Sequence, residues 1–277
     1  MSAIIHIVPG LAEPWNGIAV AAKLFASEQN AKLVDIRHAN LAVIRDADEV
    51  WVHSCWTPWV WRACRFAIAE RKRLVRMLHG NLDPLRLSYH GWKKWLVGPI
   101  ERFYLRRADY IVATCEAEKD WVQSYLDKRC PQIGVTDIKR FFDLPNLEVD
   151  ALPNDRPLHL LYLGRNHPLK GLVYLEGVGK GIEGVELRVV SNAFGDEKEK
   201  VWDWCDVLVL PTLSENFGLV VAEALERGKR VITTDGAPAW GDGNDYGGRL
   251  VYLKGYRDGS DEDRVRLLKG ALTSLVG

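Results

Sequence analysis

The sequence contains no apolar run of about 18 residues, so we expect no segment that spans a membrane. Its first residues lack a basic region and a signal-cleavage site, and a strand is expected there instead of a signal peptide. The five cysteines are scattered, and none of them forms a C-x-x-C pair or a His/Cys cluster. A zinc site or a disulfide framework is therefore not expected, and a cytoplasmic location fits best.

The chain also has no net charge, because 37 Lys and Arg residues balance 37 Asp and Glu residues among 277. This balance argues against a protein that coats nucleic acid, and no nucleic-acid-binding module is recognised. Residues 51–107 nevertheless hold 12 basic and three acidic residues, together with six tryptophans. The neutral total therefore hides one basic, aromatic stretch.

Short apolar runs alternate with longer amphipathic segments, which is typical of parallel sheets covered by helices. The rhythm breaks over residues 131–157, which contain four prolines and little periodicity. We therefore expect an α/β protein with two Rossmann-like, doubly wound domains, residues 1–150 and 151–277, with a linker at about 131–157. The predicted strands are Ile4–Val8, Lys32–Ile36, Glu49–His53, Arg73–Leu78, Tyr110–Thr114, Leu158–Leu163, Val185–Ser191, Val207–Leu210, Arg230–Thr233 and Arg249–Tyr252.

Two glutamates eight residues apart, Glu215 and Glu223, form the sharpest local signal of the second half. They follow the strand Val207–Leu210, and a helix is expected to begin near Gly218. Backbone N–H groups of residues 218–220 would then be available to bind an anion. Two carboxylates that accept hydroxyl groups beside such N–H groups suit a sugar nucleotide. From the spacing alone, an exposed loop glutamate and a surface helix glutamate explain the pattern equally well.

A second loop, residues 164–171, follows the strand Leu158–Leu163 and carries two cations. Arg165 lies at the carboxyl end of the strand, and Lys170 lies near the start of the next helix. Such a pair can neutralise a diphosphate, since Arg offers a fork of donors and Lys a point charge. A solvated turn with two surface cations is the simpler explanation for this loop taken alone. The equivalent positions of the two loops on one sheet favour a functional role.

Together these loops resemble the donor-binding signature of glycosyltransferase family 4, which comprises retaining enzymes of the GT-B fold. The family pattern joins a Gly-Arg…Lys-Gly loop to a Glu-x7-Glu element within Ser-Glu-x-Phe-Gly, and residues 164–171 and 214–223 contain both in order. In the first half, residues 52–56, 78–84, 92–94 and 113–118 are also similar to the family, and the stretch 78–84 resembles lipopolysaccharide and capsule-type members. In the second half, the similarity continues over residues 231–238. The usual Pro-Asn-Gly-Val hinge after the first domain is missing. Gly17 falls where many members have a Gly-Gly pair near the donor phosphates.

The resemblance implies transfer of a hexosyl group from a UDP- or GDP-linked sugar to a hydroxyl of a glycan or lipid-linked acceptor, in a cleft between the domains. Arg165 and Lys170 would bind the diphosphate, Glu223 the ribose hydroxyls and Glu215 the hydroxyls of the donor sugar. His79 would line the sugar side of the cleft from the first domain. The donor-binding residues implied in this way are Gly17, Arg165, Lys170, Glu215, Asn216, Phe217, Gly218, Leu219, Val220 and Glu223. The fold implied normally needs no metal, and no other cofactor is expected.

Several alternatives remain open at this point. His79 could instead be a buried core histidine whose hydrogen bonds are satisfied within the protein. For His53, a structural role is the favoured interpretation. Residues 92–107 form a basic amphipathic segment with interfacial aromatics, which suits adsorption to an anionic membrane surface during polysaccharide synthesis. A helix that packs by its aromatic side and exposes its cations explains the same pattern. A non-catalytic protein that binds nucleotide sugars or glycans is the alternative function.

Overall fold

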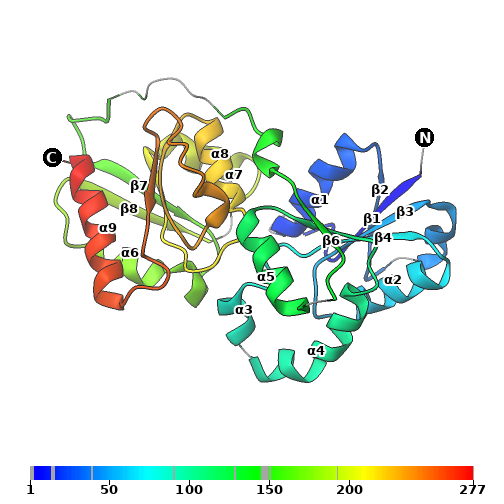
Figure 1. Ribbon diagram of the computed structural model, residues 1–277. Helices are drawn as coiled ribbons and strands as arrows, with labels where there is room; N and C mark the ends of the chain where they lie inside the picture. Colours follow the sequence, from blue (N-terminus) through cyan, green and yellow to red (C-terminus); the bar gives the residue numbers. More distant parts are fainter. Residues whose placement is uncertain are drawn as a thin grey trace. The chain divides into compact units, whose positions relative to one another are not determined.

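The computed structural model describes residues 3–13, 16–38, 40–89, 91–127, 129–144, 149, 151–191 and 193–276. The chain divides into two compact units, residues 1–138 and 139–277. Each unit contains one parallel sheet with helices (Figure 1). The predicted α/β class with two doubly wound sheets is therefore confirmed. No helix among the described residues is both long enough and apolar enough to cross a bilayer.

The sheet of the first unit has the strand order β2-β1-β3-β4-β5-β6, and every pairing is parallel. Its strands are β1 (Ile4–Val8), β2 (Lys32–Asp35), β3 (Glu49–His53), β4 (Arg73–Met77), β5 (Tyr110–Ala113) and β6 (Gln132–Val135). Its helices are α1 (Gly17–Glu28), η1 (Leu41–Asp46), α2 (Pro58–Ala69), α3 (Pro84–Ser88), α4 (Gly91–Leu105) and α5 (Glu116–Leu126). The last strand therefore lies at one edge of the sheet.

The two faces of this sheet bury different kinds of side chain, because successive residues of a strand point to opposite faces. On β3, Val50 and Val52 belong to an apolar cluster that also contains side chains of α2. The alternate residues Trp51 and His53 are buried on the other face, where Phe25 of α1 stacks on Trp51. This second face therefore holds polar rings in an otherwise apolar setting.

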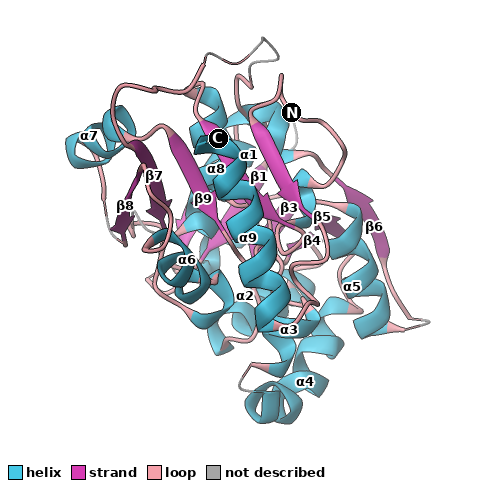
Figure 2. Ribbon diagram, turned by 90° about the vertical axis from the view of Figure 1, so that its left-hand side faces the viewer, coloured by secondary structure: helices cyan, strands magenta, loops and turns pink. Residues whose placement is uncertain are grey.

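The sheet of the second unit has the order β11-β10-β9-β7-β8, again with parallel pairings only (Figure 2 colours the strands magenta). Its strands are β7 (Leu158–Leu163), β8 (Val185–Val190), β9 (Val207–Leu210), β10 (Arg230–Thr234) and β11 (Leu250–Leu253). Its helical segments are η2 (Ile138–Phe141), which begins at the unit boundary, η3 (Pro168–Lys170), α6 (Leu172–Gly179), α7 (Asp196–Trp204), α8 (Leu219–Glu226), η4 (Pro238–Trp240) and α9 (Asp261–Val276).

The strand order of the second sheet reverses between β7 and β9, which are neighbours although β8 separates them in the sequence. Doubly wound sheets bind ligands outside the carboxyl ends of their strands at such a reversal. The loop 164–171 leaves the carboxyl end of β7, and the loop 211–218 leaves that of β9. The fold therefore places both predicted donor loops at the reversal.

Part of the predicted linker belongs to the first sheet. Within residues 131–157, β6 pairs with β5, and the first unit ends at residue 138. Gly134 lies so close to β5 that a Cβ atom there would come within 1.8 Å of the hydroxyl of Tyr110. A four-residue edge strand next to a proline is too short to show a period, so the sequence pattern did not reveal it. Residues 145–148 and 150 of the predicted linker lie outside the described residues.

Candidate functional site

The loops after β7 and β9 touch backbone to backbone. Gly171 has a left-handed φ of +66°, and a Cβ atom there would lie 1.9 Å from the carbonyl oxygen of Pro211. Only glycine allows this approach. The carbonyl of Leu169 accepts hydrogen bonds from the N–H groups of Leu213 and Ser214, at 2.8 and 3.2 Å. The two loops therefore form one substructure at the reversal of strand order.

Lys170 and Glu215 meet within this substructure, although 45 residues separate them. The Lys170 ammonium group forms an ion pair with Oε2 of Glu215, and the two side chains are only 12% and 21% exposed. The backbone N–H of Glu215 donates to the carbonyl of Gly236 at 2.7 Å. The N–H of Asn216 donates to Oε1 of Glu215 at 3.1 Å. The structure thus brings a predicted cation and a predicted carboxylate together on a well-anchored turn.

Arg165 lies exposed at the carboxyl end of β7, and a buried tyrosine holds its backbone. The hydroxyl of Tyr162 donates to the carbonyl of Arg165 at 2.9 Å. Burial raises the pKa of Tyr162 to about 12, with the negative charge of Glu215 adding to the shift. The phenol therefore stays protonated and keeps donating at neutral pH. Sequence reasoning missed Tyr162, whose only signal is a phenol inside an apolar strand.

The turn before α8 is anchored in the core. Gly218 has a φ of +72° and precedes the first helical residue, and the first N–H groups of a helix have no partner within it. Phe217 is 4% exposed and packs against the rings of Phe142 and Trp240. The indole N–H of Trp240 donates to the Phe217 carbonyl. Phe217 is therefore a packing residue that holds the turn, whereas the predicted contacts to a ligand fall on the backbone of the following residues.

Glu223 lies in α8 and is half-buried, together with Leu219 and Val220. Its carboxylate forms an ion pair with Lys198 of α7, with 2.6 Å between Nζ and Oε2. Sequence reasoning did not single out Lys198, because α7 precedes β9 and carries no part of either loop motif. Glu223 therefore pairs with a lysine of α7, whereas Glu215 pairs with Lys170 of the loop after β7.

The remaining predicted site residues, Gly17 and His79, belong to the first unit. Gly17 is exposed and opens α1, while the side chain of Asn16 caps this helix by accepting from the N–H of Ile18 at 3.1 Å. His79 follows β4 with a left-handed φ of +55° and is 6% exposed. Its Nε2 lies 2.8 Å from Nδ1 of His53. The ring is thus buried and hydrogen-bonded through Nε2.

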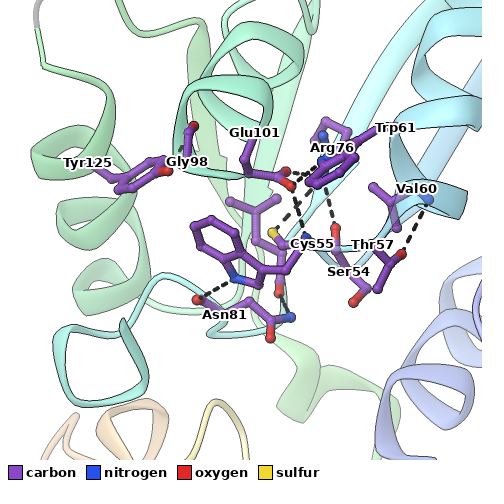
Figure 3. A network of polar contacts seen from close by, with 12 residues as sticks. Ser54, Cys55, Thr57, Val60, Trp61, Arg76, Asn81, Gly98, Glu101 and Tyr125 are labelled. Atoms are coloured by element: carbon purple, nitrogen blue, oxygen red, sulfur yellow. Dashed lines mark hydrogen bonds and ion pairs between the residues drawn. The ribbon is translucent and has the colours of Figure 1, made fainter. Parts of the chain in front are cut away.

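A buried ion pair fixes α4 to the first sheet (Figure 3). Nη2 of Arg76 donates to Oε1 of Glu101 at 2.9 Å and to the carbonyl of Ser54 at 2.8 Å. The other carboxylate oxygen of Glu101 accepts from the Trp61 indole at 2.7 Å and from the Trp56 backbone at 2.9 Å. Neither side chain of the ion pair is exposed. This network holds the side of α4 that carries Glu101 against the sheet.

The opposite side of α4 carries large apolar residues in contact with solvent. Each of them lies three or four residues from another member of the set, so they share one side of the helix. They are Trp92, Trp95, Leu96, Ile100 and Phe103, with exposed fractions from 43% to 82%. The alternative of a helix packed by its aromatic side does not hold for these five residues.

Among the residues that the structure describes, thiol groups and possible metal ligands form no second centre. The described residues contain no group of three or more His, Cys, Asp and Glu side chains placed to hold a metal ion. All five cysteines are free. Burial raises the pKa of Cys64 to about 11 and that of Cys205 to about 12, so both stay protonated and are poor nucleophiles.

Two family models match the chain, one on each unit. The model described as Glycosyltransferase Family 4 matches residues 11–132. The model described as Glycosyl transferases group 1 matches residues 146–254. Together the two matches span most of the chain. No curated protein sequence matches it at a significant level.

Several solved structures are similar to this one over nearly the whole chain. Sucrose-phosphate synthase from Thermosynechococcus elongatus has a TM-score of 0.69 at 14% identity, covering 99% of this chain and 90% of that one. HepE from Anabaena, in complex with UDP-glucose, has a TM-score of 0.67 at 14% identity, covering 100% and 92%. The trehalose-6-phosphate synthase OtsA has a TM-score of 0.66 at 12% identity, covering 99% and 91%. At these identities the likeness establishes the fold.

Proposed function

Because the chain belongs to glycosyltransferase family 4 and has the GT-B fold, we propose that it is a retaining enzyme that moves a hexosyl group from a nucleoside diphosphate sugar to a hydroxyl of a glycan or lipid-linked acceptor. The ion pair between Lys170 and Glu215 is the observation that carries this proposal. It joins the loops after β7 and β9 at the reversal of strand order, where such sheets bind ligands. A cation beside a carboxylate suits the phosphates and the hydroxyls of one donor molecule.

Stabilisation of the leaving group is the main chemical demand on this site, since the diphosphate gains negative charge as the glycosidic bond breaks. Lys170 would meet that charge as a point charge, and Arg165 as a planar fork of donors. The N–H groups of residues 218–220 would add an anion site at the start of α8. Donors held in place before the reaction stabilise developing charge without reorganisation, which makes them effective.

The two carboxylates would then accept hydrogen bonds from the hydroxyl groups of the donor. Glu215, whose backbone is tied to Gly236, would accept hydrogen bonds from the donor sugar. Glu223, positioned by Lys198, would accept from the ribose. His79 would also contact a hydroxyl group of a sugar. HepE, a similar structure, was solved with UDP-glucose and with UDP, which makes UDP-glucose the first donor to test and GDP-sugars the second.

A thermal-shift panel of UDP-, GDP- and ADP-sugars tests the donor assignment. A ligand that binds only the folded state raises the free energy of unfolding by about 2.7 kcal/mol at 100 times its Kd. We expect one nucleotide sugar to raise Tm clearly above the others, and its nucleoside diphosphate to be released when an acceptor is added. Stabilisation without any release or transfer would instead identify a non-catalytic binding protein. A panel in which no nucleotide sugar stabilises the chain or is turned over would refute both functions, and an inverted anomer in the product would refute retention.

We also propose that the exposed side of α4 adsorbs to an anionic membrane surface that carries the acceptor. Its apolar side chains lie within the stretch 51–107, which contains 12 basic residues and only three acidic ones. Aromatic residues beside cations are the combination that binds anionic interfaces. Lys93 lies over the ring of Trp92, and Arg107 lies over that of Phe103, so cation and ring occur together on this side.

Co-sedimentation with phosphatidylglycerol vesicles tests this surface. The wild-type chain is expected to bind at low salt and to be largely released at high salt, because exposed charges are screened. The Trp92→Ser and Trp95→Ser double variant should bind several-fold more weakly. A Phe194→Ser variant, which removes an exposed ring from the second unit, serves as the control and should bind like the wild type. A wild-type chain that stays in solution at low salt would remove the membrane from the proposal.

A further inference from the structure

Three histidines form a hydrogen-bonded row on the buried face of the first sheet that α1 covers. His6 comes from β1, His53 ends β3, and His79 follows β4. Nδ1 of His6 lies 2.9 Å from Nε2 of His53, and Nδ1 of His53 lies 2.8 Å from Nε2 of His79. At the other end, Nε2 of His6 lies 2.8 Å from Oε1 of Gln29. This histidine row, His6, His53 and His79, thus links a half-buried glutamine at the end of α1 to the carboxyl edge of the sheet.

The surroundings of the row keep its imidazoles neutral. Burial lowers the pKa of His6 to about 4, against the opposing effect of the hydrogen bond to Gln29. Burial lowers the pKa of His79 to about 3, and the positive charge of Arg86 adds to the shift. Burial and the neighbouring imidazoles hold the pKa of His53 well below its usual value. At neutral pH each ring therefore carries one N–H group and one bare nitrogen.

The amide of Gln29 orders these protons along the whole row. In the orientation of the amide that the structure shows, Oε1 of Gln29 faces His6. Because an amide oxygen can only accept, Nε2 of His6 donates to it, which leaves Nδ1 of His6 as an acceptor. His53 must then donate through Nε2 to His6 and accept at Nδ1. His79 in turn donates through Nε2 to His53. The remaining nitrogen of the row, Nδ1 of His79, is therefore a bare acceptor.

Exposure distinguishes the end of the row from its interior. His6 and His53 have no exposed surface, whereas His79 keeps 6% of its surface exposed. His79 is therefore the member of the row that a ligand can reach. Its backbone is held as well, because the N–H of Gly80 donates to the buried carboxylate of Glu118 at 2.5 Å.

We propose that the histidine row locks His79 in the Nε2–H tautomer, so that its Nδ1 accepts a hydrogen bond from a sugar hydroxyl group. Gln29, His6 and His53 are then positioning residues that act through His79 and do not touch the sugar. The proposal rests on the proposed function only for the identity of the hydroxyl-bearing ligand. The order of the tautomers follows from the row and the Gln29 amide, without any ligand.

Nitrogen-15 NMR of the ¹⁵N-histidine-labelled chain reads the tautomers directly, without donor or acceptor. Single substitutions of the three histidines by asparagine assign the signals. In the wild type and in Gln29→Glu, whose carboxylate can only accept, we expect His79 to carry its proton on Nε2. In Gln29→Lys, which can only donate to His6, the order should reverse and His79 should carry its proton on Nδ1. Gln123→Lys, an exposed change on α5, is the matched control and should keep the wild-type pattern.

The wild-type spectrum alone can overturn the proposal, by showing the Nδ1–H tautomer or a mixture at His79. A Gln29→Lys chain that folds but keeps the Nε2–H tautomer at His79 would overturn the role of Gln29. If that variant does not fold, Gln29→Leu removes the ordering group instead, and an unchanged single tautomer at His79 would have the same meaning.

Turnover provides the second measurement. We expect Gln29→Lys to lower kcat roughly tenfold or more, because a bare nitrogen is replaced by a donor where a hydroxyl must donate. Gln29→Glu should retain most of the wild-type kcat, which a purely structural role of Gln29 would not predict. Equal kcat values for the two Gln29 variants would overturn the link between tautomer and turnover. If the wild-type chain transfers no sugar, the NMR result still decides the order of the row while the proposed function fails separately.

Discussion

Replacing Lys170 by alanine is expected to lower kcat/KM for sugar transfer by roughly 100-fold or more. Lys170 forms an ion pair with Glu215, and the structure holds both in the loops at the reversal of strand order. Without its ammonium group, the charge that develops on the leaving diphosphate would lose one of its fixed partners. Initial rates with the donor found by thermal shift, at varied donor concentration, measure the loss. A fall mainly in kcat would locate the contact in the transition state, whereas a rise in KM alone would indicate uniform binding.

Lys180→Ala is the matched control for this variant. Lys180 is an exposed lysine at the end of α6 in the same unit, so its removal changes the net charge equally. Its kcat/KM should stay close to that of the wild type. Tm should be recorded for both variants to separate loss of chemistry from loss of fold. Wild-type kcat/KM in a folded Lys170→Ala chain would contradict the assignment of the diphosphate to this loop.

Replacing Glu101 by leucine is expected to lower the free energy of unfolding of the first unit by about 3–5 kcal/mol. The change would leave the guanidinium of Arg76 buried without its carboxylate, which is far more costly than losing a surface ion pair. The indole of Trp61 and the backbone N–H of Trp56 would lose their acceptor as well. Urea unfolding followed by tryptophan fluorescence measures the change.

A double variant separates the ion pair from the packing around it. Arg76→Met combined with Glu101→Leu replaces two buried charges by apolar side chains of similar volume, so the part of the loss that comes from the unpaired guanidinium should return. The part that comes from the lost acceptor of Trp56 and Trp61 should remain. Glu116→Leu, which removes an exposed carboxylate from α5, is the control. Its midpoint of urea unfolding should stay close to that of the wild type. A Glu101→Leu chain as stable as the wild type would show that Arg76 needs no buried partner.

Much of the fold could be predicted because buried parallel strands are short apolar runs between polar turns. The predicted bounds of Ile4–Val8, Glu49–His53, Leu158–Leu163 and Val207–Leu210 agree with the structure residue by residue. The other predicted strands differ by one residue at one or both ends, where pairing with a neighbour decides the last hydrogen bond. The strand Gln132–Val135 was missed because its four residues lie at a sheet edge and have no interior pattern.

The candidate site divides in the same way. The loops after β7 and β9 could be located from motifs, and so could their charged residues Arg165, Lys170 and Glu215. The partners of Arg165 and Glu223 could not be located, because the buried Tyr162 and the helical Lys198 lie outside both motifs. A contact between residues far apart in the sequence depends on strand order, which local patterns do not encode.

The sequence by itself determined the α/β class, the alternation of strands and helices, and the loops that carry the predicted donor contacts, since these depend on local periodicity and turn chemistry. Only the tertiary structure decided that β9 lies beside β7, which joins Lys170 to Glu215. It also decided that His6, His53 and His79 share one row. The pairing of strands creates these contacts, so they exist only once the sheets have formed.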